Sequence, residues 1–522
     1  MAHLSKIFTK VPVDIPNRSG FDMSFENLLT MKVGTLTPVL CEEVIPNETY
    51  SLGYLSQVQL PPMATNFFGR VDLRLEAFFV PMRILWGGWQ NFFTMPTNNP
   101  YGTPTVRPTD VPRLIQEAED PYTGPKELLD YLGLRNFPNA QSGSFEVSAL
   151  PLVAYHRIYD EWYRNPKITK PAFVRYDNTA TAEQRGSVGN LPWISRSMTF
   201  TSADAGYNTL ADGVSIFDLR QRCWAKDYFT TAALYPQADG TTTGASAAVD
   251  AGKISISSLR SANVLQRWLE RNNIAGERYA DQINAHFGVM PSDALIDRPI
   301  FLGSSKFGIY NRSVMQTVNQ PSNTAFQNPF SSVGSKGAST SGSGSSSLFD
   351  KFHSTEHGYL MVIASIVPHA NYASGMRKYL KHTKIGDFAF PLMQGLGEQA
   401  ILSAELNTDS GPSIFGYQQQ YAEYKYHDDE VHGLLRPGQP LESFVLSRAF
   451  GETALNTDFV TIPTTAMDNV TAVKADLSKY GAWADFYFSF KKVSPLSEYV
   501  QPTLGDLRNT HKENIDYRGK QL

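Results

Sequence analysis

Residues 71–80 read VDLRLEAFFV, and this stretch carries the strongest strand signal in the chain. The apolar residues alternate with charged ones: Val71, Leu73, Leu75, Ala77 and Phe79 alternate with Asp72, Arg74 and Glu76. Because successive side chains of a β-strand point to opposite faces, one face of this strand is predicted to be buried and the other polar. A shift of register by one residue would expose the whole apolar set.

Further strand signals lie toward both ends of the chain. Short β-compatible runs occur at 31–45 and 54–60, bounded by prolines. Residues 357–368, HGYLMVIASIVP, predict a fully buried strand. Residues 483–493, WADFYFSFKKV, set alternate phenylalanines against polar residues. Strands at both ends, with helices and loops between them, favour an antiparallel β-sandwich with insertions over a repeated β-α-β unit.

Several segments between these strands are predicted to be insertions. Residues 146–166 predict a short amphipathic helix with one apolar face, which ends at Pro166. Residues 167–220 are rich in Thr, Ser, Asn, Asp and Gly and predict a surface insertion. Residues 256–287 predict two helices, and the Ser/Gly-rich stretch 331–347 predicts a flexible loop.

Composition indicates a globular protein with an unusually small charged surface. Charged residues make up 18% of the 522, below the usual quarter. This is typical of a loop-rich β protein whose outer faces are covered by neighbouring copies, although an ordinary β-rich enzyme has a similar composition. Isolated aromatics in loop-like segments, such as Trp193, Phe217 and Tyr417, also favour burial by sister chains.

Two cysteines, Cys41 and Cys223, exclude a disulfide framework. No apolar signal segment is expected at the N-terminus, and the longest apolar run, 360–367, is far shorter than the roughly 20 residues of a membrane helix. We therefore expect maturation in the cytoplasm and no membrane span. The formal net charge of −4 means that a protein enclosing nucleic acid would need a small basic partner or a locally basic inner face.

Motifs for catalysis, metals or cofactors are absent from the sequence. It has no P-loop, no HExxH and no zinc-type Cys/His spacing. His427 and His432 flank three carboxylates, but their spacing does not place them on one helical face, so a charged turn is favoured over a metal site. The same reasoning favours an ordinary histidine over a ligand at His353 and His357. No cofactor is expected.

Two basic segments are candidates for contact with nucleic acid. The densest cluster contains Arg377, Lys378, Lys381 and Lys384. A genome-facing role competes there with a charged helix face and with a contact between subunits. The C-terminal segment 506–522 carries Arg508, Lys512, Arg518 and Lys520 beside Tyr517. It is either a solvated tail or a segment that lies on packaged single-stranded DNA.

An ordered series of segments resembles the major capsid proteins of the microviruses, particularly those of the gokushovirus-like branch. The series covers nearly the whole chain, and the order of many short segments is more specific than any one of them. It comprises TPVLCEEV at 37–44, EAFFVPMR at 76–83, YDEWYR at 159–164, KDYFT at 226–230, YPQ at 235–237, RY at 278–279, HFGV at 286–289, EHGY at 356–359, GEQA at 397–400, FGY at 415–417 and AEY at 422–424.

This resemblance implies a mainly β fold, an eight-stranded antiparallel jelly roll with large loop and helical insertions in a single domain over 1–522. It implies a virion protein without catalysis, assembled in the host cytoplasm into an icosahedral T=1 shell built from pentamers. The shell would enclose circular single-stranded DNA together with a small basic DNA-binding protein and a minor pilot protein. Outer loops would contact a receptor on the host.

One departure from the gokushovirus pattern concerns the insertion that builds surface protrusions. In those relatives a long insertion follows the segment similar to 235–237, whereas here only the short loop 238–252 follows it. The expansion lies instead at 167–220, so either this segment builds a different protrusion or the shell is smoother than in those relatives. We expect the segment to project outward and to contact the host. Its candidate host-facing aromatics are Phe173, Tyr176, Trp193 and Tyr207.

Two other classes of protein remain as alternatives. A β-sandwich hydrolase or carbohydrate-binding protein would use aromatic-rich loops as a substrate cleft, but no acid/base pair supports it. A host-binding spike or lectin-like adhesin would differ from a capsid subunit because its copies would not close into a shell.

Overall fold

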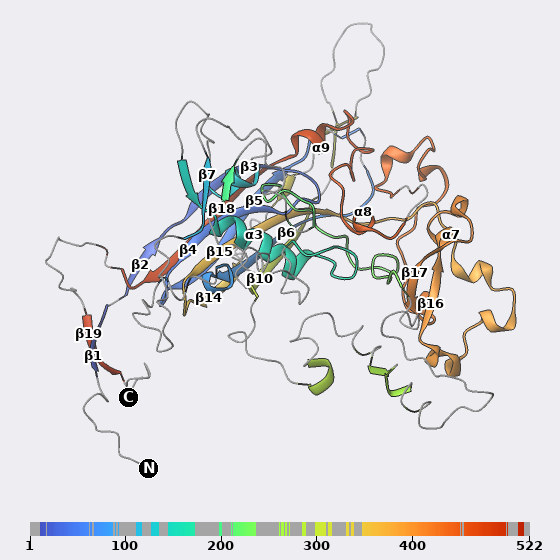
Figure 1. Ribbon diagram of the computed structural model, residues 1–522. Coiled ribbons are helices and arrows are strands. Elements are labelled where there is room, and N and C mark those ends of the chain that lie inside the picture. Colours follow the sequence, from blue (N-terminus) through green and yellow to red (C-terminus); the bar gives the residue numbers. More distant parts are fainter. Residues whose placement is uncertain are drawn as a thin grey trace, which may run out of the picture.

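The computed structural model describes two β-sheets, a covering helix and a smaller unit at one end of the molecule (Figure 1). The described residues are 11–16, 18–61, 63–64, 67–86, 89, 92, 111–116, 127–134, 145–172, 198–200, 210, 212–235, 260, 263–265, 267–268, 271, 284–288, 298–309, 312–315, 330–333, 336–338, 347–448, 450, 454–496, 498 and 510–515.

The first sheet has four strands, each antiparallel to its neighbours. Its order is β10 (Ile300–Ile309), β6 (Val71–Pro81), β15 (Gly358–Pro368) and β4 (Thr37–Val44). The two central strands, β6 and β15, pair over their whole lengths. Every residue of β15 is buried, which confirms the prediction of a fully buried strand at 357–368.

The second sheet is built around β18 (Ala482–Ser494) and is also antiparallel. One side of β18 pairs with β5 (Thr49–Gln59), and the other pairs with β2 (Ser19–Asp22) and β3 (Phe25–Met31) in succession. The far side of β5 pairs with β13 (Lys336–Ala338) and β14 (Ser347–His353). The described chain is therefore mostly β with antiparallel sheets, as the sequence predicted.

The main hydrophobic core lies between these sheets. It contains the alternating residues of β6, from Val71 to Phe79, and the phenylalanines of β18 at 486, 488 and 490. The predicted alternation of both strands is confirmed. The opposite face of β6 is not in solvent, however, because Asp72 is buried and Phe78 and Val80 enter a second core. The prediction of an exposed polar face was therefore wrong for this strand.

The second core lies between the first sheet and helix α3 (Leu150–Ile158), which continues as one π-turn, η4 (Tyr159–Tyr163). The helix was predicted to be amphipathic, with one apolar face formed by Leu152, Tyr155, Ile158, Tyr159 and Trp162. Instead His156, Arg157 and Glu161 are buried together with the apolar residues. Trp162, assigned to the apolar face, is the residue of η4 that is exposed. These polar side chains can be buried because they form hydrogen bonds and ion pairs inside the fold.

The two sheets approach each other along both sides. On one side β10 lies against β14, where a Cβ atom added to Gly303 would lie 2.0 Å from the carbonyl oxygen of Leu348. A register shift of β10 occurs between Phe301 and Gly303 at the same place. On the other side the Asn27 amide of β3 donates to the carbonyl of Val39 in β4, at 2.8 Å.

A third hydrophobic cluster forms the unit drawn in orange in Figure 1, at the opposite end of the molecule from β2. It combines Tyr228 and Phe229 with residues between Tyr372 and Val460. Its hairpin is β16 (Glu398–Leu402) and β17 (Ile414–Gln419). The short helices of this unit are η6 (Lys378–Lys381), η7 (Ile385–Asp387), η8 (Pro391–Leu396), α7 (Ser403–Leu406), η9 (Thr408–Ser410), η10 (Ala422–Tyr424), η11 (Gly433–Leu435), η12 (Glu442–Phe444) and α8 (Thr457–Val460).

The remaining elements are short. They are β1 (Val11–Pro16) paired with β19 (Thr510–Ile515), β7 (Arg113–Gln116) between β8 (Phe145–Ser148) and β9 (Met198–Phe200), β11 (Arg312–Met315) paired with β12 (Phe330–Val333), η2 (Met82–Ile84), α2 (Glu127–Tyr131) and α9 (Asp476–Tyr480). No helix among the described residues is long and apolar enough to span a bilayer.

The predicted insertions are described only in part. Within 256–287, helical residues occur at 263–265 and 284–287, and Trp268 stacks on His286 with centroids 6.0 Å apart. Within 331–347, two pieces form strands β12 and β13, so the described part of this stretch is not all loop. Most of 167–220 lies outside the described residues, but its final part packs inside the molecule, where Phe217 is fully buried. Phe217 is thus covered by its own chain, which corrects its reading as an aromatic covered by sister chains.

Candidate assembly surface

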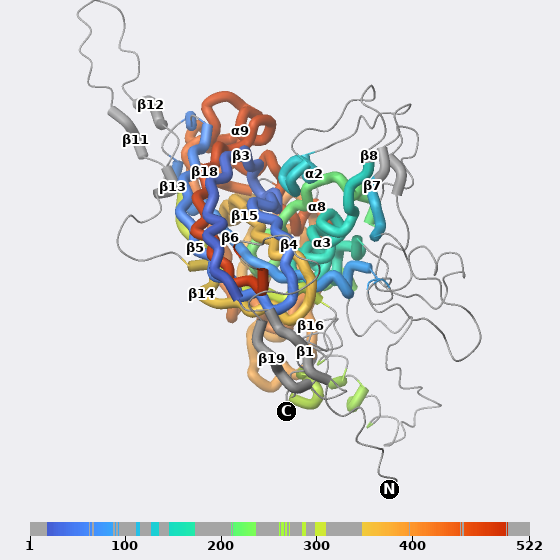
Figure 2. Tube along the Cα trace, turned by 90° about the vertical axis from the view of Figure 1, so that its left-hand side faces the viewer, coloured from blue at the N-terminus to red at the C-terminus, as the bar shows by residue number. Residues whose placement is uncertain are grey.

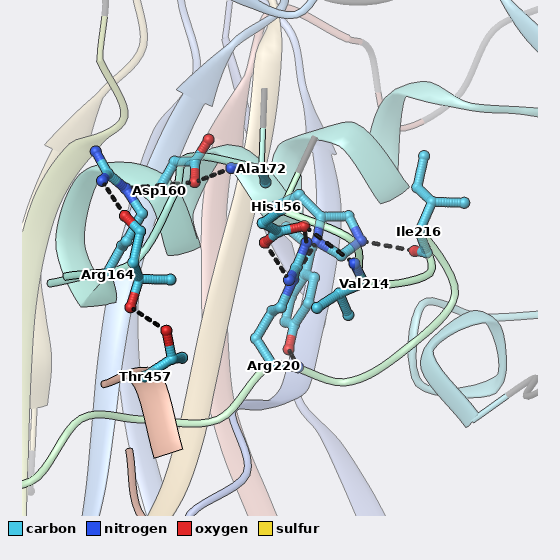
Figure 3. Close-up of polar contacts among 11 residues, drawn as sticks. His156, Asp160, Arg164, Ala172, Val214, Ile216, Arg220 and Thr457 are labelled. Atoms are coloured by element: carbon cyan, nitrogen blue, oxygen red, sulfur yellow. Dashed lines mark hydrogen bonds and ion pairs between the residues drawn. The ribbon is translucent and has the colours of Figure 1, made fainter. Parts of the chain in front are cut away.

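The buried charges of α3 are the first cluster that resembles a chemical site. Figure 3 shows His156 and Arg220 side by side, with Arg220 contributed by the final residues of the 167–220 segment. Arg220 donates from Nε to Nδ1 of His156 at 3.0 Å and from a terminal nitrogen to Asp212 at 2.6 Å. The other ring nitrogen of His156 lies 2.6 Å from the carbonyl oxygen of Ile216.

These contacts define the protonation state of His156. Since Nδ1 accepts from a permanently charged guanidinium, the proton of the neutral ring resides on Nε2 and is donated to Ile216. Burial, and then the charge of Arg220, hold the pKa of His156 well below 6.5. A histidine with both nitrogens occupied and no exposed surface has no means of exchanging protons with a substrate. The cluster therefore has a structural role: it joins α3 to residues 212–220, and we call it a structural clamp.

A second, half-buried pair joins the first sheet to the same segment. Arg222 donates two hydrogen bonds to Glu76 of β6, at 2.7 and 2.9 Å, and the hydroxyl of Tyr163 also donates to Glu76. Burial raises the pKa of Glu76, but the hydrogen bonds and charge of Arg222, together with Tyr163 and Arg74, outweigh burial, and the pKa lies below its usual value. The carboxylate is therefore charged and fully partnered, which is the state expected of a structural ion pair.

The end unit is centred on Arg448. Its guanidinium lies over the rings of Trp224, Tyr372, Phe450 and Phe459, at 4.6 to 5.8 Å from their centroids. It also donates to the carbonyl of Phe459 at 2.7 Å. This aromatic cage ties the segment containing Trp224 to the strands and turns of the end unit.

Carboxylates gather beside this cage. Asp227 accepts a hydrogen bond from the hydroxyl of Tyr372 at 2.6 Å, and burial followed by the charge of Asp227 raises the pKa of Asp428 to about 6. Among the described residues no group of three or more ligand-type side chains has a geometry that would hold a metal ion. Glu430, between the two histidines of the predicted charged turn, is bound by Arg377 at 2.6 Å and by His432 at 3.2 Å.

The surface of the end unit is unusually apolar over one continuous segment, residues 378–396, which we call the apolar arm. Its exposed large side chains are Tyr379, Leu380, Ile385, Phe388, Phe390, Leu392 and Met393. Leu392 is 94% and Ile385 83% exposed. Monomeric proteins rarely leave so many large apolar side chains together in water, so a surface of this kind marks an interaction site.

A groove of about 1160 Å³ lies at the seam where β3 of one sheet faces β4 of the other. Its floor and walls include exposed Leu28 and Trp483, and residues 130–133 at the end of α2 flank it. The α2 wall is fixed by a hydrogen bond from the hydroxyl of Tyr131 to the carbonyl of Thr30, at 2.8 Å. Figure 2 shows α2, β3, β18 and β4 on the same side of the molecule.

The structure places the candidate DNA-facing residues in different surroundings. Arg377 is paired with Glu430, and the amino group of Lys378 donates to the carbonyl of Ala400 at 3.0 Å. Lys384 is exposed and Lys381 is half-buried, and both belong to the apolar arm. Lys512 lies on β19, opposite Asp14 of β1. Arg508, Arg518 and Lys520 lie outside the described residues, as do the candidate host-facing residues Phe173, Tyr176, Trp193 and Tyr207.

Sequence reasoning missed the buried clamps and the two surfaces. The signal for the clamps was the mixture of charged and aromatic residues within 155–164. The arm had a weaker signal. Ile385, Phe388 and Leu392 recur at helical spacing, but Gly386 and Pro391 interrupt the segment and disfavour one continuous helix.

Antiparallel sheets, buried charges held in ion pairs and an exposed apolar arm are typical of a structural subunit that packs against other proteins. Residues 9–504 match the family described as Capsid protein (F protein), and the chain belongs to this family of phage capsid proteins. It is a virion component. The resemblance to microvirus major capsid proteins and the prediction of a structural protein rather than an enzyme are both confirmed.

Curated relatives agree over nearly full length. The chain is 26% identical to the capsid protein VP1 of Chlamydia phage 1, over 95% of this chain and 97% of the relative. It is also 26% identical to the capsid protein VP1 of Bdellovibrio phage phiMH2K, over 96% and 98%. Identity with the capsid protein VP1 of Spiroplasma virus 4 is 23%, over 93% and 95%.

Proposed function

We propose that copies of this chain close into an icosahedral T=1 shell, built from pentamers, around a circular single-stranded DNA phage genome. The observation that carries the proposal is the apolar arm on a chain that belongs to a capsid family. A capsid subunit associates with itself, and its interaction surfaces are apolar where neighbours cover them. Assembly takes place in the host cytoplasm under this proposal.

The fold proposed for this role is an eight-stranded jelly roll in a single domain over 1–522. Strand order supports it: β3, β18, β5 and β14 follow one another in one sheet, and β4, β15, β6 and β10 in the other. Successive strands of the chain thus alternate between sheets except at β6 and β10, which is the pattern of two interlocked Greek keys. The segments 167–220, 256–287 and 331–347 are insertions between its strands.

The genome requires partners in this proposal. With a formal net charge of −4, the chain does not neutralise DNA phosphates by itself. A small basic DNA-binding protein supplies that charge, and a minor pilot protein completes the particle. The C-terminal residues Arg508, Lys512, Arg518 and Lys520 are the proposed contacts of the chain with the DNA. A genome-facing role for the cluster at 377–384 stays a prediction, since two of its four cations are already bound within the chain.

Contact with the host receptor is assigned to the 167–220 insertion, including Phe173, Tyr176, Trp193 and Tyr207. Its length and polar composition support an outward position. Deleting the tip of this insertion should abolish attachment of the phage to its host while particles still form. Unchanged attachment by intact mutant particles would contradict the assignment.

The shell itself is tested by sedimentation followed by negative-stain electron microscopy of the purified chain, expressed with and without its phage partners. Closed isometric particles in either case are the expected result. Discrete monomers that persist even with the partners present would refute self-assembly into a shell.

A further inference from the structure

We infer that the apolar arm of one copy docks into the groove between β3 and β4 of a second copy, so that the chain associates head to tail. The inference rests on the proposed shell function and deepens it by naming the two surfaces that meet. It begins from the chemistry of these surfaces, which lie on different parts of the same molecule.

The arm carries cations that its own chain leaves available. Among the described residues neither Lys381 nor Lys384 forms an ion pair, although Lys384 interacts electrostatically with Asp387. His382 contacts the rings of Phe388 and Tyr424. The one carboxylate of the arm, Asp387, accepts hydrogen bonds from the backbone of Thr383 and Lys384, at 2.9 and 2.8 Å. The arm is therefore an exposed apolar segment that also carries positive charge.

The groove has the opposite charge. Its described lining includes four carboxylates, from Glu26, Glu42, Asp130 and Asp485, and contains no lysine or arginine. The same lining exposes apolar surface, since Leu28 is 70% and Trp483 49% exposed. A groove lined by apolar side chains and carboxylates complements an apolar arm that carries lysines, in both hydrophobicity and sign of charge.

The groove is also large enough for side chains of the arm. Its volume of about 1160 Å³ accommodates several residues of the size of leucine or phenylalanine. Leu392, at 94% exposure, is the most protruding of the described large apolar residues and is the natural anchor of the contact.

The arm and the groove of one molecule lie too far apart to contact each other. Figure 1 places β3 and β18 in the sandwich and the arm's unit, with β16 and β17, at the far end of the molecule. When the arm of one copy enters the groove of the next, that copy still has a free arm. Such a contact between unlike surfaces repeats, and it closes a ring when the rotation between copies allows.

Packaged DNA is the rival partner of the arm, because cations beside aromatic rings also bind single strands. The aliphatic residues argue against it. Leu380, Ile385 and Leu392 offer no ring on which a base can stack, yet they are among the most exposed side chains of the arm. An acidic groove of matching character in the same chain further favours protein over DNA.

Introduced cysteines give a direct test in assembled particles made with the full chain and its partners. One chain carries Leu28→Cys, in the groove, and another carries Leu392→Cys, in the arm. Mild oxidation of particles containing both chains should give covalent dimers, whereas a chain with both substitutions should give a ladder of linked chains. Native Cys41 also lines the groove, but burial raises the pKa of its thiol to about 12, so little of it is thiolate at neutral pH.

A matched control pairs Leu392→Cys with Leu496→Cys, since Leu496 is also an exposed leucine but lies beyond the other end of β18. This pair should not cross-link. Closed particles in which the groove and arm cysteines fail to link would overturn the docking contact and leave the shell role intact. If the unmodified chain forms no particles even with its partners, the shell role fails, and this inference fails with it.

Charge exchange provides an independent measurement. The double substitution Lys381→Glu and Lys384→Glu should raise the protein concentration needed for assembly by about tenfold or more, and Glu26→Lys with Asp485→Lys should restore it. The DNA content per particle should be the same as in the parent for both sets of substitutions. If the arm substitutions instead lower the DNA content, leave assembly unchanged and are not rescued from the groove, the arm faces the genome and the inference is wrong.

Discussion

At the scale of single residues, His156 makes the stability of the chain depend on pH. The folded state keeps the ring neutral, because burial and Arg220 hold its pKa well below 6.5. The unfolded chain takes up a proton near its ordinary pKa of about 6.5, so below that pH it binds more protons than the folded chain. The free energy of unfolding should therefore fall by about 1.4 kcal/mol per pH unit as the pH drops below that value.

The variant His156→Gln tests this dependence, since glutamine keeps a donor near the carbonyl of Ile216 and does not titrate. It should be less stable than the parent at pH 8 and should lose part of the slope between pH 6.5 and 5. Asp428, with a pKa of about 6, contributes in the opposite sense but equally in both proteins. Urea unfolding curves across this pH range measure the difference, with exposed His432→Gln as the control. Parallel curves would contradict the prediction.

Arg448 permits a second residue-scale prediction. Its guanidinium contacts four aromatic rings, and lysine retains the charge but not the planar group that stacks on them. Arg448→Lys should therefore lower the free energy of unfolding by about 1 to 2 kcal/mol. Thermal unfolding of the purified chain measures the loss. The exposed Arg436→Lys is the matched control and should differ from the parent by less than about 0.5 kcal/mol.

At the scale of elements, the approach of β10 to β14 depends on a residue without a side chain. A Cβ atom at position 303 would lie 2.0 Å from the backbone oxygen of Leu348, so one of the strands must move. Gly303→Ala should destabilise the chain by about 1 to 3 kcal/mol. Gly386→Ala is the control, because nothing lies within 4 Å of its added methyl group. Equal urea midpoints for the two variants would show that the strands separate without cost.

The strands were the elements that the sequence predicted best. Period-two alternation in 71–80 and 483–493 reflects a real difference between two environments, and β15 was identified by the absence of such alternation. The face opposite the core was predicted poorly. A charged residue in a strand indicates water only when no partner exists, and Glu76 has Arg222, which lies 146 residues away in the chain. Pairings of that separation are invisible to local patterns.

The candidate site was less predictable than the fold. The cluster of cations at 377–384 was found from composition, but Arg377 and Lys378 proved to be held by Glu430 and Ala400. The acidic groove combines residues from β3, β4, α2 and β18. Such a surface exists only after the sheets have formed, so no motif announces it. The family resemblance provided the function, and the structure provided the surfaces.

At the scale of the whole molecule, net charge governs the interaction with nucleic acid. At −4 the chain should bind a single-stranded oligonucleotide weakly by itself at physiological salt, because few phosphate counterions are released. Fluorescence anisotropy with increasing salt measures both affinity and its salt slope. Addition of a small basic DNA-binding protein should allow the DNA to be retained in particles. Tight binding by the chain alone, with a steep salt dependence, would contradict this prediction and indicate a strongly basic inner face.

The unequal sides of the β-sandwich have a consequence for how the protein avoids precipitation. On one side β10 and β14 lie too close for another strand to enter, and on the other the seam carries a groove lined with carboxylates. A strand edge open on both sides would let identical chains add backbone to backbone without limit. Here one side is closely packed, and the carboxylates of the other repel segments that carry negative charge. Under the proposed docking, association would have a direction and an end point, which distinguishes a closed container from an aggregate.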